Sequence, residues 1–329
     1  WAALVQRRPW PALVAAVLAL LALSAPALDM RLGFADAGND AGSTTSRQAY
    51  DLLARGFGPG FNGPLVVVAE GSGEDVQREL AGTAGVAAAL PAAPSPDGAV
   101  ATILAIPETA PQAAETEALV SRLRERSDGR YLVGGATAAS TDYSAAIADR
   151  LPLFVGVVVG LSALLLMVVF RSVLIPLKAA VLNLLSIGAS LGVITMAFDD
   201  PIEAFIPVMT FAIVFGLSMD YEVFLVSRMH EEWERTRDAE RAIGEGLAHT
   251  GRVITAAAAI MIVVFGAFVL SPERMLQQFG LGLAVAILLD ALVIRCVIVP
   301  AVMRLLGDRA WWMPGWAARR LPRAAVERA

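Results

Sequence analysis

Six runs of about 18 or more predominantly apolar residues divide this chain, and each is long enough for an α-helix to cross the hydrocarbon core of a bilayer. They lie at residues 9–28, 151–170, 174–198, 204–226, 253–270 and 279–305. Hydrophobic residues make up 57% of the 329 positions and the mean hydropathy is +0.62, which is too apolar for a soluble protein. The runs predict a membrane α-helical bundle of six transmembrane helices, the first within residues 1–28 and the others within 151–306.

The first run has a competing interpretation as a cleaved signal peptide. Arg7 and Arg8 precede it, and residues 24–27 (SAPA) loosely resemble a cleavage region. Its length of about 20 residues favours a full membrane span instead.

Residues 29–150 are rich in Gly, Pro, Ala and charge, and they contain no run of span length. Pro and Gly in 56–64 indicate a loop. After the loop, strands are expected at 65–69, 86–90, 100–106 and 131–134, and helices at 74–84 and 113–126. The resulting β-α-β-β-α-β order predicts an α+β ferredoxin-like domain. A helix at 140–149 is expected to lead into the second span.

Basic residues gather at one side of the predicted bundle, while Asp199, Asp200 and Glu203 lie in a short turn on the other side. The basic residues, besides those of the tail 307–329, are Arg7, Arg8, Arg171, Lys178, Arg228, Arg235, Arg237, Arg241, Arg252 and Arg304. The positive-inside rule then places both termini in the cytoplasm, segment 29–150 outside, and a connector helix at 228–250 inside the cell. We expect a multi-pass protein of the plasma (inner) membrane.

Composition argues against several other classes of protein. A formal net charge of −5 disfavours a nucleic-acid partner. His230 and His249 form no metal-ligand cluster, and Cys296 has no second cysteine to pair with. We expect no metal and no cofactor.

Charge inside an apolar run is costly and often functional, and Asp220, Asp290 and Arg295 are the charged residues in such runs that we single out as candidates. At 1.5 Å per residue, Asp220 and Arg295 each lie about 24 Å along their helices. This equal depth allows an Asp220–Arg295 pair or a cluster of Asp220, Tyr221 and Asp290. Asp290 and Arg295 are five residues apart, whereas α-helical neighbours are three or four apart, so each is expected to find its partner on another helix.

Two interpretations of these charges compete. Asp220 and Arg295 either form a fixed buried pair that sets the helix register, or Asp220 gains and loses protons as they cross the membrane. We favour proton transfer for Asp220, leave both interpretations open for Asp290 and Arg295, and expect a structural role for Glu222.

The sequence resembles the C-terminal half of the mycobacterial membrane protein large (MmpL) family, within the resistance–nodulation–division (RND) superfamily of proton-driven exporters. The matching stretches are 215–233, 251–268, 278–316 and the loop 57–65, and the motifs SMDYE (218–222) and LLDALVIR (288–295) are the most specific. The resemblance implies twelve spans in two parallel halves, each with a porter domain outside the membrane. It also implies a proton relay in which Asp220 and Tyr221 match the Asp–Tyr pair of the fourth span, and Asp290 and Arg295 match charges tied to that relay.

The resemblance further implies a lipid or other amphiphilic substrate, with protons as the coupling ion. The chain begins at Trp1, so we expect a fragment whose partner is a missing N-terminal half or a second subunit. The predicted function is proton-motive-force-driven lipid export.

Three alternatives remain: a non-transporting membrane sensor or scaffold, a secretion accessory, and an intramembrane protease. A protease would use Asp220 and Asp290, but Arg295 at a similar depth would suppress a dyad that shares a proton.

Overall fold

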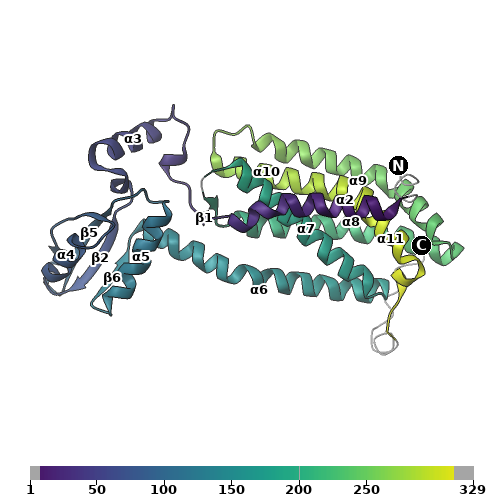
Figure 1. The fold of residues 1–329 in the computed structure, drawn as a ribbon, viewed down its shortest axis with the longest axis horizontal. Helices are drawn as coiled ribbons and strands as arrows, with labels where there is room; N and C mark the ends of the chain where they lie inside the picture. The colour runs from purple at the N-terminus through teal and green to yellow at the C-terminus, as the bar shows by residue number, and fades with distance from the viewer. Residues whose placement is uncertain (1–7, 200, 315–329) are drawn as a thin grey trace.

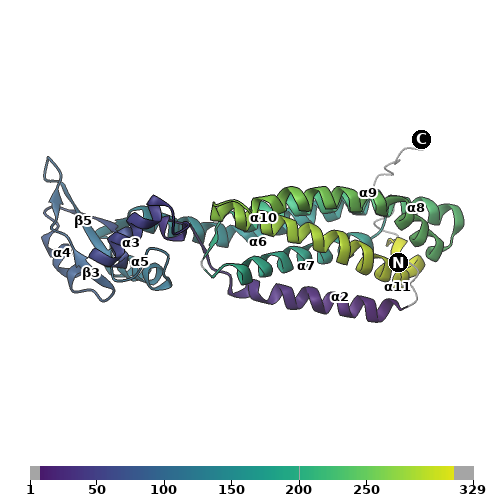
Figure 2. The same cartoon turned by 90° about the horizontal axis from the view of Figure 1, so that it is seen from above.

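The computed structural model describes residues 8–199 and 201–314. A long helical bundle carries an α+β domain at one end, and the start of α2 (Pro9–Ser24) lies at the other end together with α11 (Val299–Leu306) (Figures 1 and 2). The described chain has six helices long and apolar enough to cross a membrane. An apolar segment in lipid must satisfy its own backbone hydrogen bonds, which a helix does. The six predicted spans are confirmed as helices.

The helices over the runs 151–170, 204–226, 253–270 and 279–305 are longer than the runs that predicted them. Their bounds are α2 Pro9–Ser24 with the 3₁₀ turn η1 Ala25–Asp29, α6 Ala136–Phe170, α7 Leu174–Ala197, α8 Ile206–Thr236, α9 Ala239–Phe268, α10 Arg274–Leu288, the π-helix η4 Leu289–Ile298 and α11 Val299–Leu306. A short 3₁₀ turn, η5 Gly307–Trp311, follows α11.

Two predicted boundaries are wrong. The helix expected at 140–149 and the second span form one continuous helix, α6, which passes through Pro152 without a break. The connector helix expected at 228–250 is instead the end of α8 and the start of α9. Arg237 adopts a left-handed conformation (φ 55°), and the Asp238 side chain accepts the backbone amides of Glu240 and Arg241 as an N-cap. These two residues end one helix and begin the next.

The α+β domain contains every strand and helix predicted between residues 65 and 134. They are β2 Leu65–Glu70, α4 Glu74–Ala81, β3 Val86–Ala89, β5 Val100–Pro107, α5 Ala114–Ser127 and β6 Tyr131–Gly134, with a short β4 Ala93–Pro94 beside β5. The sheet order is β3-β5-β2-β6, and each pair is antiparallel. Alternate β2 residues, Leu65 and Val67, are fully buried against Leu80 of α4 and Leu119 of α5.

Several short elements were not predicted. These are the helix α3 Thr45–Phe57, the 3₁₀ turns η2 Ala37–Asn39 and η3 Pro59–Asn62, and a parallel pair of two-residue strands, β1 Leu32–Gly33 with β7 Ile202–Glu203. Neither β1 nor β7 is long enough to show a hydrophobic period of its own.

Glycine allows α2 and α7 to approach closely. A Cβ atom on Gly192 would lie 1.9 Å from the carbonyl oxygen of Leu23, and one on Gly188 would lie 3.2 Å from the Ser24 hydroxyl. Gly156 and Gly160 share the same spacing in α6 but have nothing within 4 Å of such an atom. The small-residue spacing marks a helix contact in α7 and none within the described chain in α6.

Candidate functional site

Four charged side chains are buried together between α7, α8 and the π-helix η4. They are Lys178, Glu222, Asp290 and Arg295, and each is at most 8% exposed. Lys178 lies about 6 Å along α7 from its first residue, so the cluster is in the half of the bundle far from the α+β domain. Two positive and two negative groups give this cluster, which we call the charge quartet, no net formal charge.

The π-helix makes Asp290 and Arg295 direct neighbours. Arg295 Nε donates to Asp290 Oδ2 at 2.9 Å. The expectation that each would find its partner on another helix missed this contact, because it assumed α-helical spacing, although both residues do also contact Ser218 on α8. A π-helix bonds residue i to i+5 and therefore brings side chains five apart onto one face.

Arg295 also joins η4 to α8. Its Nη2 donates to Ser218 Oγ at 2.9 Å and to the Ser218 carbonyl oxygen, and its Nη1 lies 3.6 Å from Glu222 Oε2. The guanidinium carbon is 5.3 Å from the centre of the Tyr221 ring, a cation–π distance. Ser218, Tyr221 and Glu222, which lie within little more than one turn of α8, therefore all contact one arginine.

Ser218 connects the quartet to Asn183 of α7. Its hydroxyl oxygen lies 2.8 Å from Asp290 Oδ1 and is also hydrogen-bonded to Asn183 Oδ1. A serine hydroxyl carries one proton, so it serves one of these two acceptors at a time. A change of charge at Asp290 would therefore be felt at α7 through the hydroxyl of Ser218.

Lys178 was predicted to be one of the basic loop residues, and this is wrong. It lies inside α7, and its Nζ donates to Glu222 Oε1 at 2.6 Å, with both side chains 5% exposed. A lysine within an apolar run is itself a signal of burial, and the count of loop charges overlooked this signal. The buried pair matches the structural interpretation of Glu222.

Asp220 lies outside the quartet. It is exposed on the surface of α8, and within the described chain it forms no ion pair, since Arg295 pairs with Asp290 and Glu222. The Asp220–Arg295 pair that equal depth allowed is not formed in the described chain, because depth along a helix ignores rotation about it. Asp220 and Glu222 differ by about 200° around α8, so only one of them can face the bundle.

Tyr221 lies between these two environments. It is half-buried, its ring faces Arg295, and its hydroxyl is 3.9 Å from the sulfur of Met261. The structure thus brings Tyr221, Asp290 and Arg295 together and leaves Asp220 beside them on the outer surface of the bundle.

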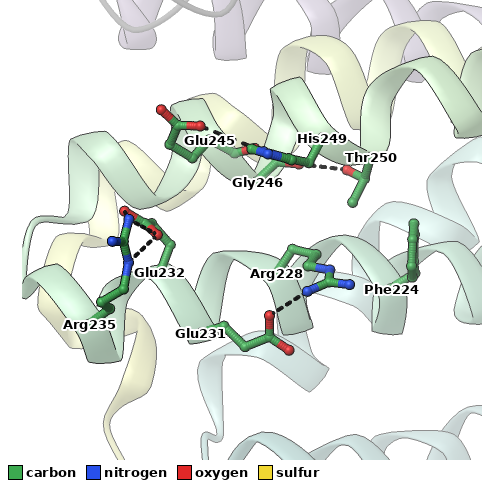
Figure 3. Close-up of a pocket in the computed structure, with 9 residues that line it drawn as sticks. All are labelled: Phe224, Arg228, Glu231, Glu232, Arg235, Glu245, Gly246, His249 and Thr250. Atoms are coloured by element: carbon green, nitrogen blue, oxygen red, sulfur yellow. Dashed lines mark hydrogen bonds and ion pairs between the residues drawn. The ribbon is translucent and has the colours of Figure 1, made fainter. Parts of the chain in front are cut away.

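A separate pocket of about 550 Å³ lies between the ends of α8 and α9 (Figure 3). Its charged groups pair with one another, as in Arg228–Glu231 and Arg235–Glu232, both at 2.8 Å. None of the four predicted relay residues lines this pocket.

Comparisons with known proteins agree with this architecture. Residues 67–327 match the model of the MMPL family. The chain is 39% identical to membrane protein YdfJ of Bacillus subtilis, over 99% of this chain and 49% of that protein. It is 30% identical to the mycolic acid-containing lipids exporter MmpL11 of Mycolicibacterium smegmatis, over 100% of this chain and 38% of that protein.

A third relative is the trehalose monomycolate exporter MmpL3 of Mycobacterium tuberculosis, which is 44% identical over 57% of this chain and 21% of that protein. The chain spans about half or less of the length of each of these curated relatives. Together with six membrane-length helices, the family model and the two alignments that cover nearly all of this chain show that this multi-pass membrane chain belongs to the MMPL family.

Proposed function

We propose that this chain is one half of a proton-driven exporter of lipids or other amphiphilic molecules of the cell envelope. The observation that carries the proposal is the position of Asp220, a carboxylate without an ion pair in the described chain, on a membrane-length helix next to a buried, charge-balanced cluster. Two of the relatives are named as lipid exporters, which supports the substrate class.

Asp220 is better placed to exchange protons than the buried carboxylates. Glu222 and Asp290 each contact a cation in the quartet, and protonating either one would leave a buried positive charge without compensation. Asp220 has no such partner in the described chain. Its protonation instead changes the field at Tyr221, the next residue, whose ring faces Arg295.

Exposure of Asp220 supports a second half that covers it. An exposed stripe runs along α8 through Met209, Ala212, Gly216, Asp220 and Phe224. A carboxylate facing lipid is costly, whereas small residues at Ala212 and Gly216 permit another helix to pack closely. We assign this stripe to contact with the partner half, from a longer chain or a second subunit.

In this proposal the α+β domain is a porter domain outside the membrane. Its β-α-β-β-α-β order is that of a ferredoxin-like unit, and the basic residues of the loops away from this domain support cytoplasmic ends by the positive-inside rule. Helix α6 runs unbroken from the end of this domain through the membrane, so a movement of the spans reaches the domain without a flexible joint. Asp220 and Tyr221 form the relay, while Arg295, held by its ion pair with Asp290, keeps the Tyr221 ring in place.

The test is Asp220→Asn in the full-length protein. We expect loss of proton flux into proteoliposomes, followed with a pH-sensitive dye, at unchanged yield and elution profile. Untargeted mass spectrometry of envelope lipids, in cells with the variant as the only copy, should match the deletion strain. Glu231→Gln, which removes an exposed carboxylate farther along α8, is the control and should transport normally. Normal proton flux and a normal lipid profile for Asp220→Asn would contradict the relay and favour the alternative of a non-transporting membrane sensor or scaffold.

A further inference from the structure

Two connections join the α+β domain to the bundle. One is the continuous helix α6, and the other is the segment that leaves η1 and passes through β1 at the neck of the molecule (Figure 1). This second connection pairs with the loop between α7 and α8. The amide of Ile202 donates to the Arg31 carbonyl at 2.8 Å, and that of Ala204 donates to the Gly33 carbonyl at 2.9 Å.

A buried carboxylate adds a further hydrogen bond to this strand pairing. Glu203 is 3% exposed, and its Oε1 accepts the backbone amide of Ala35 at 2.7 Å. Its own amide donates at 3.1 Å to Oε1 of Gln278, a fully buried residue of α10. Glu203 is therefore held by the bundle on one side and holds the segment that enters the domain on the other.

The segment of residues 31–36 also contacts the α+β domain and α6. The Arg31 guanidinium pairs with Glu117 of α5 at 3.0 Å and donates to the Gln112 carbonyl at 3.2 Å. The ring of Phe34 meets that of Tyr143 on α6 edge to face, with centroids 5.2 Å apart. Residues 31–36 thus contact the domain, α6 and the bundle within six positions.

The neck is packed too tightly for these contacts to be incidental. A Cβ atom on Gly33 would lie 2.7 Å from Cβ of Pro201, so only glycine fits there without a shift. Beneath it, Ile194, Ile202 and Ile206 form a small buried core that also contacts Met30. Burial raises the pKa of the Glu203 carboxyl, opposed by the Ala35 amide and the charge of Arg274. A neutral side chain could also accept the Ala35 amide, and burying an ionisable group costs more than burying a neutral one.

We propose that Glu203 is a positioning residue that latches segment 31–36 to the bundle and so makes the α+β domain move with the transmembrane helices. The latch itself is a property of the fold, whereas its role in coupling rests on the proposed transport function. Its failure can therefore be separated from a failure of that function.

The latch is tested without any transport assay. In the full-length protein, hydrogen exchange of the peptide covering residues 31–36 should become about tenfold faster in Glu203→Ala, the effect of one lost net hydrogen bond. Glu203→Gln keeps an acceptor at Oε1 and should exchange like the wild type. Glu203→Asp keeps the charge but is one methylene shorter, so it should exchange faster and serves if the alanine variant folds poorly. Glu273→Ala, an exposed carboxylate at the same end of the bundle, is the matched control.

A distance measurement adds a second readout. Spin labels at position 78 of α4 and position 270 after α9, both exposed, report the domain against the bundle in a background without other cysteines, including Cys296→Ser. The distribution of distances between the two labels should broaden in Glu203→Ala and stay narrow in Glu203→Gln and Glu273→Ala. Unchanged exchange and distances in Glu203→Ala, or equal disruption by Glu203→Gln, would overturn the latch.

Coupling is then read from transport. Glu203→Ala should keep proton flux in proteoliposomes while the envelope lipid profile shifts toward that of the deletion strain, whereas Asp220→Asn should lose both. If Glu203→Ala shows faster exchange and a broader distance distribution but a wild-type lipid profile, the latch stands and its role in coupling is refuted. Normal flux in Asp220→Asn would overturn the proposed function and leave the exchange and distance results standing.

Discussion

Removing Lys178 alone should destabilise the bundle far more than removing Lys178 and Glu222 together. Their charged atoms are 2.6 Å apart and both side chains are 5% exposed, so solvent screens the pair little. Lys178→Met leaves the quartet with a net charge of −1, Glu222→Gln leaves it at +1, and the double variant restores neutrality around Asp290 and Arg295. Breaking a buried pair from one side costs about 3–5 kcal/mol, while removing both partners is often close to neutral.

The assay is a double-mutant cycle in detergent micelles, with free energies of unfolding measured from tryptophan fluorescence. Each single variant should lose about 3–5 kcal/mol, and the double variant should lose less than either. The control cycle uses Arg228→Met and Glu231→Gln, an ion pair that is 54% and 58% exposed and should contribute about 0–1 kcal/mol. Additive losses at Lys178 and Glu222, or a Lys178→Met loss within the control range, would refute a charged, mutually compensated quartet.

Three further predictions concern packing, pH and geometry. Gly192→Ala should cost about 1–3 kcal/mol because its Cβ would overlap the Leu23 carbonyl oxygen, whereas Gly160→Ala, which meets nothing, should be neutral or stabilising; equal melting temperatures would contradict this. Burial raises the pKa of Glu203 above its ordinary value of 4.5, so the wild type binds the extra proton when folded and loses stability as pH rises through that window. The free energy of unfolding of Glu203→Gln, relative to the wild type, should therefore increase as pH rises from below 4.5 and then reach a plateau. A relative stability that decreases with pH would contradict this prediction. Arg295→Lys should cost about 1.5–3 kcal/mol in denaturant titrations, since one ammonium cannot replace the bonds of Nε and Nη2 together, and full stability would argue against those contacts.

The bundle and the order of elements in the α+β domain could be predicted because their signals are local. An apolar run of span length such as 174–198 can lie in a membrane only as a helix, and alternation in LVVVA at 65–69 indicates a strand within five residues. Each strand and helix predicted between residues 65 and 134 was found there, and only the two-residue strand β4 was missed. The family could also be inferred, because motifs such as SMDYE are contiguous.

The partners of the charged residues were decided only by the tertiary structure. Depth along a helix placed Asp220 level with Arg295, but rotation about α8 turns Asp220 outward and Glu222 inward. Lys178, counted among the loop charges, became the closest partner of Glu222 because α7 and α8 pack at that level. The Glu203 latch joins positions 35 and 203, which no local period relates.

The π-helix shows why such partners cannot be derived from spacing alone. Sequence determined that Asp290 and Arg295 lie five residues apart, and on an α-helix that spacing separates them. The folded chain adopts i→i+5 bonding from Leu289 to Ile298, where Arg295 also reaches Ser218 on α8, and under that geometry the same two residues are neighbours. Local composition therefore determined which segments are helices, while packing between helices determined the helical pitch and, with it, which charges meet.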